Sequence, residues 1–435
     1  MPAVPNDRAD VNRPSAGAHP DRTALGLFVF AWAVPAIVAG WAAYTMVPQA
    51  PPLVPGVAME RHQGVARLIF DPWQNWDGQW FLEIARFGYG REGTPAFFPF
   101  YPAVVRGMAT FFMKDHMLAA LVSSWLAFGA ALVLLSRQLF RDFGRSRATA
   151  SLLLLVSFPT ALFFHAAYSE SLFLLLATAT LVMARRGRWL SAGLLGFFAI
   201  FTRSAGVALV PALAVEAWAQ ALSRRQPSRS PAPSWGSFFS REGLGGLRRV
   251  PLRAAFGIAL PLLALPAILG VYQHALGDPW AFREAQRLWE RHPSAPWSAL
   301  IDGIRVVVPG QPWTLAPLAG GFPRLEHYPG GFLEASVYNL LAALFGIALS
   351  VVALRKLPAM YGAYACAGLL VPLTTASQLM PLYSMPRFVV VLFPLFVALA
   401  LLLERRPLLQ ALVVATFSAA QGFAVARFAL WYWVA

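Results

Sequence analysis

The chain has 435 residues, of which 58% are hydrophobic and only 13% are charged, and its formal net charge is +15. A soluble protein needs more charge to cover its surface, so this composition excludes a soluble fold. The basic residues are arginines between apolar runs, without a stripe interleaved with aromatic residues, which argues against nucleic-acid binding. A single cysteine, Cys366, excludes an intrachain disulfide and thiolate-based clusters, and seven scattered histidines predict no dedicated metal site.

Apolar runs of the length that crosses a bilayer recur along the whole chain. They predict an all-α polytopic membrane protein with about eleven transmembrane helices and interfacial helices in a large first outer loop. The first run is too long for a cleaved signal peptide and is expected to serve as a signal anchor. The expected spans are 24–47, 117–136, 148–165, 167–184, 189–203, 204–219, 253–275, 334–354, 358–377, 386–403 and 407–430.

The distribution of charge orients these spans. The apolar stretch 96–113 is not expected to cross, because Pro99 and Pro102 break its first turns. With that stretch outside, the two large outer loops together hold eleven basic and eleven acidic residues, and the entire net charge lies on the other side. The positive-inside rule therefore predicts a cytoplasmic N-terminus and an outer C-terminus.

This orientation also divides the chain into segments. We expect a disordered cytoplasmic tail and a single integral membrane domain, interrupted by a flexible basic linker that faces anionic lipid. The tail is 1–23, the membrane domain is 24–435, the outer loops are 48–116 and 276–333, and the linker is 220–253.

One acid in the first outer loop is the leading catalytic candidate. Asp77 lies between Trp76 and Gly78, just before the amphipathic stretch Gln79–Phe87. Aromatic side chains can hold such a short helix at the interface, where a carboxylate can take a proton from an acceptor hydroxyl. An acid before a glycine also caps helices and makes turns, so a purely structural role stays open.

Further ionisable residues fall on the same predicted face. Glu170 lies in the expected outer turn after the third span, near His165. The structural alternative for Glu170 is helix capping, and for His165 it is a hydrogen bond within the bundle. Arg203 and Arg387 lie at outer helix ends and suit a phosphate or diphosphate leaving group, although snorkelling would also explain them. The convergence of these charges with Asp77 on one face is the main functional signal.

Several short motifs in chain order resemble one known family. They are Trp76-Asp-Gly-Gln-Trp-Phe, Ala96-Phe-Phe-Pro-Phe-Tyr-Pro, Phe158-Pro-Thr-Ala through Tyr168-Ser-Glu-Ser, Thr202-Arg-Ser-Ala-Gly and Ser384-Met-Pro-Arg-Phe. In these pieces the chain resembles the PIG-V-like mannosyltransferases, relatives of the enzyme that adds the second mannose in GPI-anchor assembly. That family belongs to the GT-C superfamily of membrane glycosyltransferases.

The resemblance implies a function and roles for particular residues. It implies transfer of a mannose or related hexose from a polyprenyl-phosphate donor, with inversion at the sugar carbon and no metal or cofactor. It implies Asp77 as the catalytic base, Arg387 and Arg203 as ligands of the departing lipid phosphate, and Glu170 as the residue that positions the acceptor. The residues expected to bind donor or acceptor are Trp76, Gly78, Gln79, Tyr101, His165, Tyr168, Glu170, Arg203 and Arg387.

The sequence departs from the family at two points. Many relatives carry two acids in the first-loop motif where this chain has only Asp77, and Ser204 replaces the proline of a Thr-Arg-Pro motif. The Ala/Arg/Pro/Trp bias suggests a high-GC bacterium without GPI anchors. The expected acceptor is therefore a glycolipid, glycan or glycoprotein of the cell envelope, on the outer face of the inner (plasma) membrane.

Three other functions stay open. A flippase or transporter of lipid-linked sugars would need charged groups at mid-membrane depth along a path. An oligosaccharide ligase or polymerase would use the same donor chemistry with a larger outer cavity. A scaffold without enzyme activity would leave the clustered outer charges unexplained.

Overall fold

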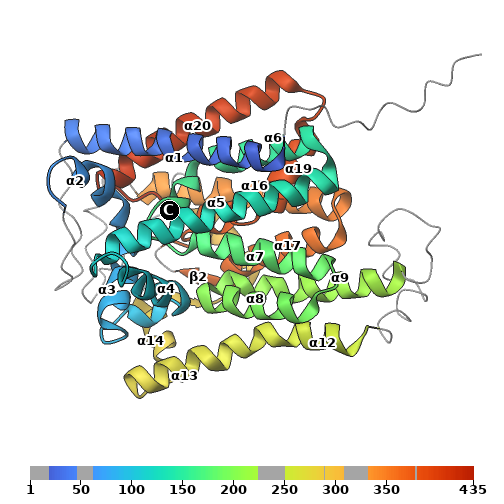
Figure 1. The fold of residues 1–435 in the computed structure, drawn as a ribbon, viewed down its shortest axis with the longest axis horizontal. Helices are drawn as coiled ribbons and strands as arrows, with labels where there is room; N and C mark the ends of the chain where they lie inside the picture. Colours follow the sequence, from blue (N-terminus) through green and yellow to red (C-terminus); the bar gives the residue numbers. More distant parts are fainter. Residues whose placement is uncertain (1–18, 47–61, 224–249, 289, 308–331, 378–379) are drawn as a thin grey trace, which may run out of the picture.

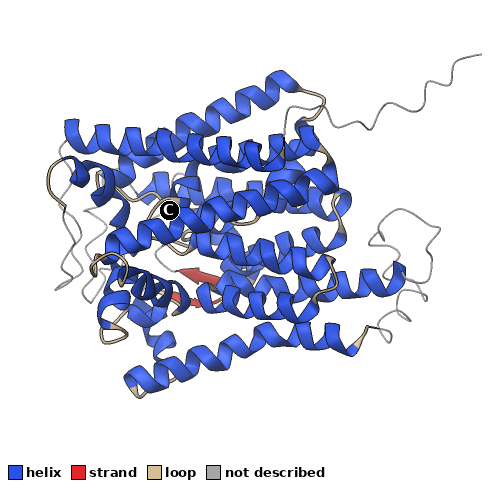
Figure 2. Cartoon of the chain, viewed as in Figure 1, coloured by secondary structure: helices blue, strands red, loops and turns tan. Residues whose placement is uncertain are grey.

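A computed structural model describes residues 19–46, 62–223, 250–288, 290–307, 332–377 and 380–435. Nearly all of this described part is helical, and its two short strands pair with each other (Figure 2). The N-terminal half contains the elements α1 (Pro20–Thr45), α2 (Val65–Phe70), η1 (Asp71–Gln74), α3 (Asp77–Phe87), η2 (Thr94–Ala96), α4 (Phe100–Ala109), α5 (His116–Phe143), α6 (Arg145–Ser157), η3 (Pro159–Phe164), α7 (Glu170–Arg185), α8 (Trp189–Thr202), η4 (Ser204–Ala208) and α9 (Leu209–Ser223).

The C-terminal half continues the bundle and adds the strand pair. The strands are antiparallel, with Arg291 opposite Ser377 and Pro293 opposite Thr375. The elements are α12 (Leu252–Ala259), η5 (Leu260–Leu263), α13 (Ala264–Leu276), α14 (Ala281–Leu288), β1 (Arg291–Pro293), α15 (Pro296–Val307), α16 (Phe332–Lys356), α17 (Ala359–Leu373), β2 (Thr375–Ser377), α18 (Met385–Val390), α19 (Phe393–Leu403) and α20 (Pro407–Ala429).

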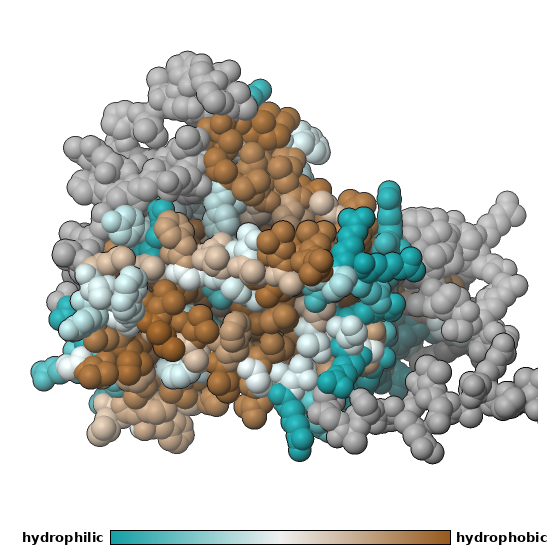
Figure 3. Space-filling model, turned by 90° about the horizontal axis from the view of Figure 1, so that it is seen from above, coloured by the Kyte–Doolittle hydropathy of each residue, from teal (hydrophilic) through white to brown (hydrophobic). Residues whose placement is uncertain are grey.

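The helices form a multi-pass membrane bundle, as the hydropathy pattern predicts. On the surface seen in Figure 3, hydrophobic residues cover the middle and hydrophilic residues gather toward the ends. Large apolar side chains are exposed on α1 and α20, for example Ile37 (70%) and Leu408 (87%), where a bilayer would cover them. In the described part, the stretches long and apolar enough to cross are Pro20–Thr45, His116–Phe143, Ser204–Ser223, Leu252–Leu276, Ser336–Lys356 and Pro407–Ala429, with shorter apolar helices at Trp189–Thr202, Ala359–Leu373 and Phe393–Leu403.

The two ends of the bundle differ in the elements that they hold. Figure 1 shows the long helices side by side, with the short helices α2, α3, α4 and α14 gathered at one end. Helix α7 has 16 residues and therefore separates Glu170 from Arg185 by about 22 Å. Arg185 pairs with Asp142 at the end of α5, and Arg147 pairs with Glu404 beyond α19. These basic helix ends therefore share the end of the bundle opposite Glu170, which agrees with the charge partition read from the sequence.

Some expected boundaries differ from those observed. Helix α1 begins at Pro20, so the expected tail 1–23 extends too far into the chain; its residues 1–18 lie outside the described part. The expected linker 220–253 has helical ends in α9 and α12, and 224–249 lies outside the described part. The stretch 96–113 contains only α4, whose ten residues span about 15 Å and are too short to cross.

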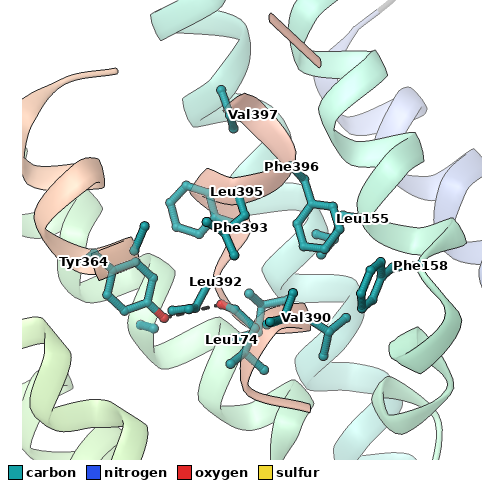
Figure 4. Close-up of a cluster of buried hydrophobic side chains, with 14 of the residues drawn as sticks. Leu155, Phe158, Leu174, Tyr364, Val390, Leu392, Phe393, Leu395, Phe396 and Val397 are labelled. Atoms are coloured by element: carbon teal, nitrogen blue, oxygen red, sulfur yellow. Dashed lines mark hydrogen bonds between the residues drawn. The ribbon is translucent and has the colours of Figure 1, made fainter. Parts of the chain in front are cut away.

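Several expected spans are broken helices. The run 148–165 divides into α6 and η3, 358–377 into α17 and β2, and 386–403 into α18 and α19. The last break precedes Pro394, a residue that has no N–H to continue a helix. It leaves the carbonyl of Val391 without its usual helical partner, and the hydroxyl of Tyr364 donates to that carbonyl at 3.3 Å (Figure 4).

The largest apolar core lies around these breaks. The ring of Phe158, at the end of α6, lies 5.3 Å from the ring of Phe396 and 5.7 Å from that of Phe345. Figure 4 shows Leu155, Phe158 and Phe396 facing one another beside the α18–α19 break. Packing at this junction holds the short helix α18 in place, and α18 carries one of the candidate site residues.

Close helix packing elsewhere depends on small residues. A side-chain carbon at Gly257 in α12 would collide with the carbonyl oxygen of Trp189 in α8, and one at Gly193 would lie 2.7 Å from the carbonyl oxygen of Gly257. Small residues allow helix backbones to approach closely in this way. By contrast, nothing lies within 4 Å of the space beside Gly270 in α13.

A histidine joins the first loop to the start of α5. The ring of His62 contacts Asp71 through Nδ1 at 2.8 Å and Asp115 through Nε2 at 3.1 Å. Asp115 also caps α5 by accepting from the N–H of Leu118 at 2.7 Å. Burial alone would lower the pKa of His62, but the two carboxylates outweigh burial, and the pKa of His62 is raised.

Candidate active site

Asp77 is the first residue of α3 and is held by the turn before it. Trp76 has a positive φ of 59°, a conformation that side chains rarely adopt and that often marks a functional site. The backbone N–H of Asp77 donates to the hydroxyl of Tyr168 at 3.0 Å, and this hydroxyl in turn donates to the carbonyl of Asn75 at 3.0 Å. Tyr168 therefore fixes the start of α3 from the α6–α7 connection.

Three further contacts hold this turn. The N–H of Ala167 donates to the carbonyl of Trp73 at 2.9 Å, and the Asn75 amide donates to the carbonyl of Phe428 at 2.8 Å. The indole N–H of Trp76 donates to the carbonyl of Tyr432 at 3.2 Å. Segments far apart in the sequence, including the C-terminal residues, thus fix the direction in which the Asp77 side chain points.

Four charged side chains form one continuous ion-pair chain. Arg387 donates through Nη1 to Oδ2 of Asp77 at 2.5 Å and through Nε to Oε1 of Glu170 at 2.8 Å. Arg203 donates to the same Oε1 of Glu170 at 2.5 Å. The expected convergence of Asp77, Glu170, Arg203 and Arg387 is therefore present as direct contacts.

Each member of this chain lies at a helix terminus or a helix break. Glu170 begins α7, Arg203 lies between α8 and η4, and Arg387 lies in the short α18. The guanidinium of Arg387 also lies over the ring of Tyr168 at 4.8 Å, and that of Arg203 lies over Phe388 at 5.4 Å. In a membrane protein, such broken backbone occurs where it is buried in protein or lines a cavity.

A cavity of about 170 Å³ lies against this charged chain. Its charged lining consists of Asp77, Arg203, Arg291 and Arg387. Its aromatic lining consists of Phe81, Phe97, Phe98, Phe282, Tyr383 and Phe388. One wall can therefore bind an anion, and the aromatic rings offer faces against which a sugar ring can pack.

Glu170 does not reach the cavity, which changes the role that we assign to it. Its side chain is 0% exposed, and both of its nearest partners are arginines of the cavity wall. Glu170 is therefore not part of the surface that lines the cavity. Its position instead suits a role in aligning Arg203 and Arg387.

The remaining expected binding residues lie outside the cavity lining. The backbone around Asp77 is flanked by Trp76 and Gly78 and contacted by Tyr168, as described above. Gln79 is buried on α3. Tyr101 is fully buried, with its hydroxyl 3.0 Å from that of Ser124. His165 is buried between the rings of Trp73 and Phe128. Their positions outside the cavity lining therefore do not support direct contact with a substrate.

Sequence reasoning missed Arg291, which comes from 276–333, the segment expected to form the second outer loop. It begins β1, and its guanidinium lies over the ring of Tyr383 at 5.2 Å. Several other arginines lie in the same loop, so nothing in the local sequence distinguishes Arg291 from them. Only the pairing of β1 with β2 after α17 brings it to the cavity. Burial and the neighbouring cations Arg387 and Arg203 outweigh Tyr383 and Asp77, so the pKa of Arg291 lies below its ordinary value.

The described residues also bear on metal binding. Among them, no group of three or more His, Cys, Asp or Glu side chains is arranged to hold a metal ion. The charged groups at the cavity are one carboxylate with three guanidinium groups, which favours anionic ligands over cations.

The family comparison agrees with the resemblance read from the motifs. The family model of mannosyltransferase (PIG-V) matches residues 50–226. GPI mannosyltransferase 2 of Drosophila melanogaster is 36% identical over 112 residues, which cover 23% of this chain and 24% of that protein. The Drosophila pseudoobscura pseudoobscura enzyme matches with the same identity and coverage. The aligned region thus spans about a quarter of these curated relatives.

Solved structures with some likeness include an archaeal oligosaccharyltransferase and ArnT. The oligosaccharyltransferase of Archaeoglobus fulgidus has 13% identity and a TM-score of 0.44, covering 94% of this chain and 56% of that one. ArnT from Cupriavidus metallidurans, solved with undecaprenyl phosphate, has 14% identity and a TM-score of 0.30, covering 86% and 77%. Similarity at this level adds no argument about this chain. The match to the PIG-V mannosyltransferase model covers less than half of the chain, and the matched segment 50–226 holds Asp77, Glu170 and Arg203.

Proposed function

We propose that this protein is a membrane mannosyltransferase that uses a polyprenyl-phosphate-linked mannose. The donor would enter from the bilayer, and a glycolipid, glycan or glycoprotein hydroxyl would accept the sugar on the outer face. The observation that carries this proposal is the direct pairing of Asp77 with Arg387 at a cavity that also holds two other arginines. A base beside cations suits acceptor activation coupled to departure of a phosphate.

The proposed reaction is a single in-line displacement. The acceptor oxygen attacks C1 of mannose and loses its proton to the carboxylate of Asp77. The bond between C1 and the phosphate oxygen breaks, and its electron pair leaves with the phosphate. The products are the new glycoside with inverted C1, the polyprenyl phosphate and a protonated Asp77, so charge and atoms balance.

The geometry of Asp77 supports this role. Arg387 holds its Oδ2, whereas its Oδ1 has no hydrogen-bond partner among the residues that the structure describes. The side chain is 20% exposed toward the cavity. One oxygen is thus fixed in place while the other is free to accept a proton.

The test compares Asp77→Asn with the wild type, using radiolabelled polyprenyl-phosphate-mannose and a membrane lipid extract. Asparagine keeps the shape and can still accept from Arg387, so the bundle should remain folded. We expect mannose transfer to fall by about 100-fold to 10,000-fold, the usual contribution of a general base.

The matched control is Asp302→Asn, which removes an exposed carboxylate paired with Arg305 in α15. It should transfer mannose at the wild-type rate. Equal transfer by the Asp77 and Asp302 variants would refute Asp77 as the base. Transfer of a whole oligosaccharide but not of single mannose would instead favour a ligase.

A further inference from the structure

The two arginines expected to bind phosphate are already neutralised within the protein. Arg387 pairs with Asp77 and Glu170, and Arg203 pairs with Glu170. Two guanidinium groups therefore face two carboxylates, and this set of four residues has no net charge. Removing Arg387 would disturb Asp77 and Glu170 as well as any ligand, and removing Arg203 would disturb Glu170.

Arg291 is the exception on the cavity wall. It has no carboxylate within ion-pair distance in the part of the chain that the structure describes, and its guanidinium lies over the Tyr383 ring. Added to the neutral set, it gives the cavity wall a net charge of one positive unit. An unpaired cation beside two other arginines attracts an anion.

The strand pair holds Arg291 in position. In β1, Arg291 is partly buried, whereas His292 and Pro293 are exposed. The N–H of Ser294 donates to the carbonyl of Thr374 at 2.9 Å, and its hydroxyl accepts from the N–H of Ala376 at 3.1 Å. These bonds attach the second outer loop to the end of α17 and aim Arg291 at the cavity.

We propose that Arg291 binds the phosphate of the lipid-linked donor and of the polyprenyl phosphate that leaves. This inference rests on the proposed function and adds a binding residue from a part of the chain beyond 50–226. The donor phosphodiester carries one negative charge, which matches the single unpaired cation. As the C1–O bond breaks, the phosphate gains a second negative charge, so the contact strengthens in the transition state.

The proposal predicts a charge-dependent affinity that does not require turnover. Binding of undecaprenyl phosphate to the full chain in detergent would be measured beside that of undecaprenol, which has the same tail without the phosphate. The wild type should prefer the phosphate, and Arg291→Ala should weaken its binding by about tenfold or more and abolish the preference. Arg291→Lys keeps the charge but not the fork of donors, and should fall between them.

Arg287→Ala is the matched control, because Arg287 is an exposed arginine of α14, four residues away, paired with Glu284. It should bind undecaprenyl phosphate as the wild type does. Inorganic phosphate added as a competitor distinguishes a site for a lipid-linked phosphate from a site for free phosphate. If the site binds the lipid, inorganic phosphate should displace little undecaprenyl phosphate. If Arg291→Ala does not fold, Arg291→Gln takes its place.

The outcomes separate this proposal from the proposed function. Wild-type affinity for undecaprenyl phosphate in Arg291→Ala or Arg291→Gln overturns the role of Arg291, even when mannose transfer is intact. Binding that depends on Arg291, with no mannose transfer by the wild type, supports the phosphate site and refutes the transferase. Strong competition by inorganic phosphate overturns the assignment of the site to a lipid-linked phosphate.

Discussion

Glu170 is the residue whose removal tests most directly how the site is held together. Glu170→Gln keeps the side-chain shape but removes the charge that Arg203 and Arg387 share. A hydrogen bond to a charged group is worth about 1.5–3 kcal/mol and a neutral one about 0.5–1.5 kcal/mol. Two such bonds are weakened, and two buried cations are left facing Asp77 alone.

The expected loss is therefore about 3–5 kcal/mol of unfolding free energy, the range for breaking a buried ion pair from one side. Denaturant unfolding in detergent, followed by tryptophan fluorescence, measures it. Glu284→Gln is the control, because Glu284 is 65% exposed and its pair with Arg287 is screened by water. This control should unfold like the wild type.

A double variant shows whether charge balance is the cause. Glu170→Gln combined with Arg203→Met leaves the Asp77–Arg387 pair balanced, so it should be more stable than Glu170→Gln alone. The reasoning is refuted if Glu170→Gln is as stable as Glu284→Gln. It is also refuted if the loss of unfolding free energy in the double variant equals the sum of the losses in Glu170→Gln and Arg203→Met.

Two further predictions concern packing and pH. Gly257→Ala places a methyl group against the carbonyl of Trp189, so α12 must move from α8, and unfolding free energy should fall by about 1–3 kcal/mol. Gly270→Ala, which has open space, should not be destabilised, and equal stability of both variants would contradict the packing argument. His62, whose pKa is raised in the folded state, contributes stability that is fully present below its unfolded pKa and is lost as pH rises through its folded pKa. The wild type should therefore lose stability across that interval while His62→Gln does not, and parallel pH profiles of melting temperature would contradict this.

Much of the fold follows from local patterns in the sequence. A long apolar run must satisfy its backbone hydrogen bonds within a helix, so composition alone predicts a helical membrane protein. Prolines and isolated charges also mark the helix ends, which is why Asp77, Glu170, Arg203 and Arg387 could be named together. The positive-inside rule placed them on one face before any contact was known.

The sequence was less informative about helix breaks. The runs 148–165 and 386–403 look continuous in hydropathy, since an apolar residue scores alike in a helix and in a break. The break before Pro394 is tolerated because the hydroxyl of Tyr364, from another helix, binds the carbonyl that it exposes. Such a partner is a tertiary contact and leaves no local signal.

The sequence by itself determined the class of molecule, the grouping of its charges and its resemblance to a family, because hydrophobicity, charge and short motifs are properties of single segments. Only the tertiary structure decided which charges are paired. It showed Glu170 sealed behind two arginines and Arg291 brought to the cavity by a strand pair. Burial and ion pairing depend on side chains from distant segments meeting in space, so identical arginines in one loop differ in role only after folding.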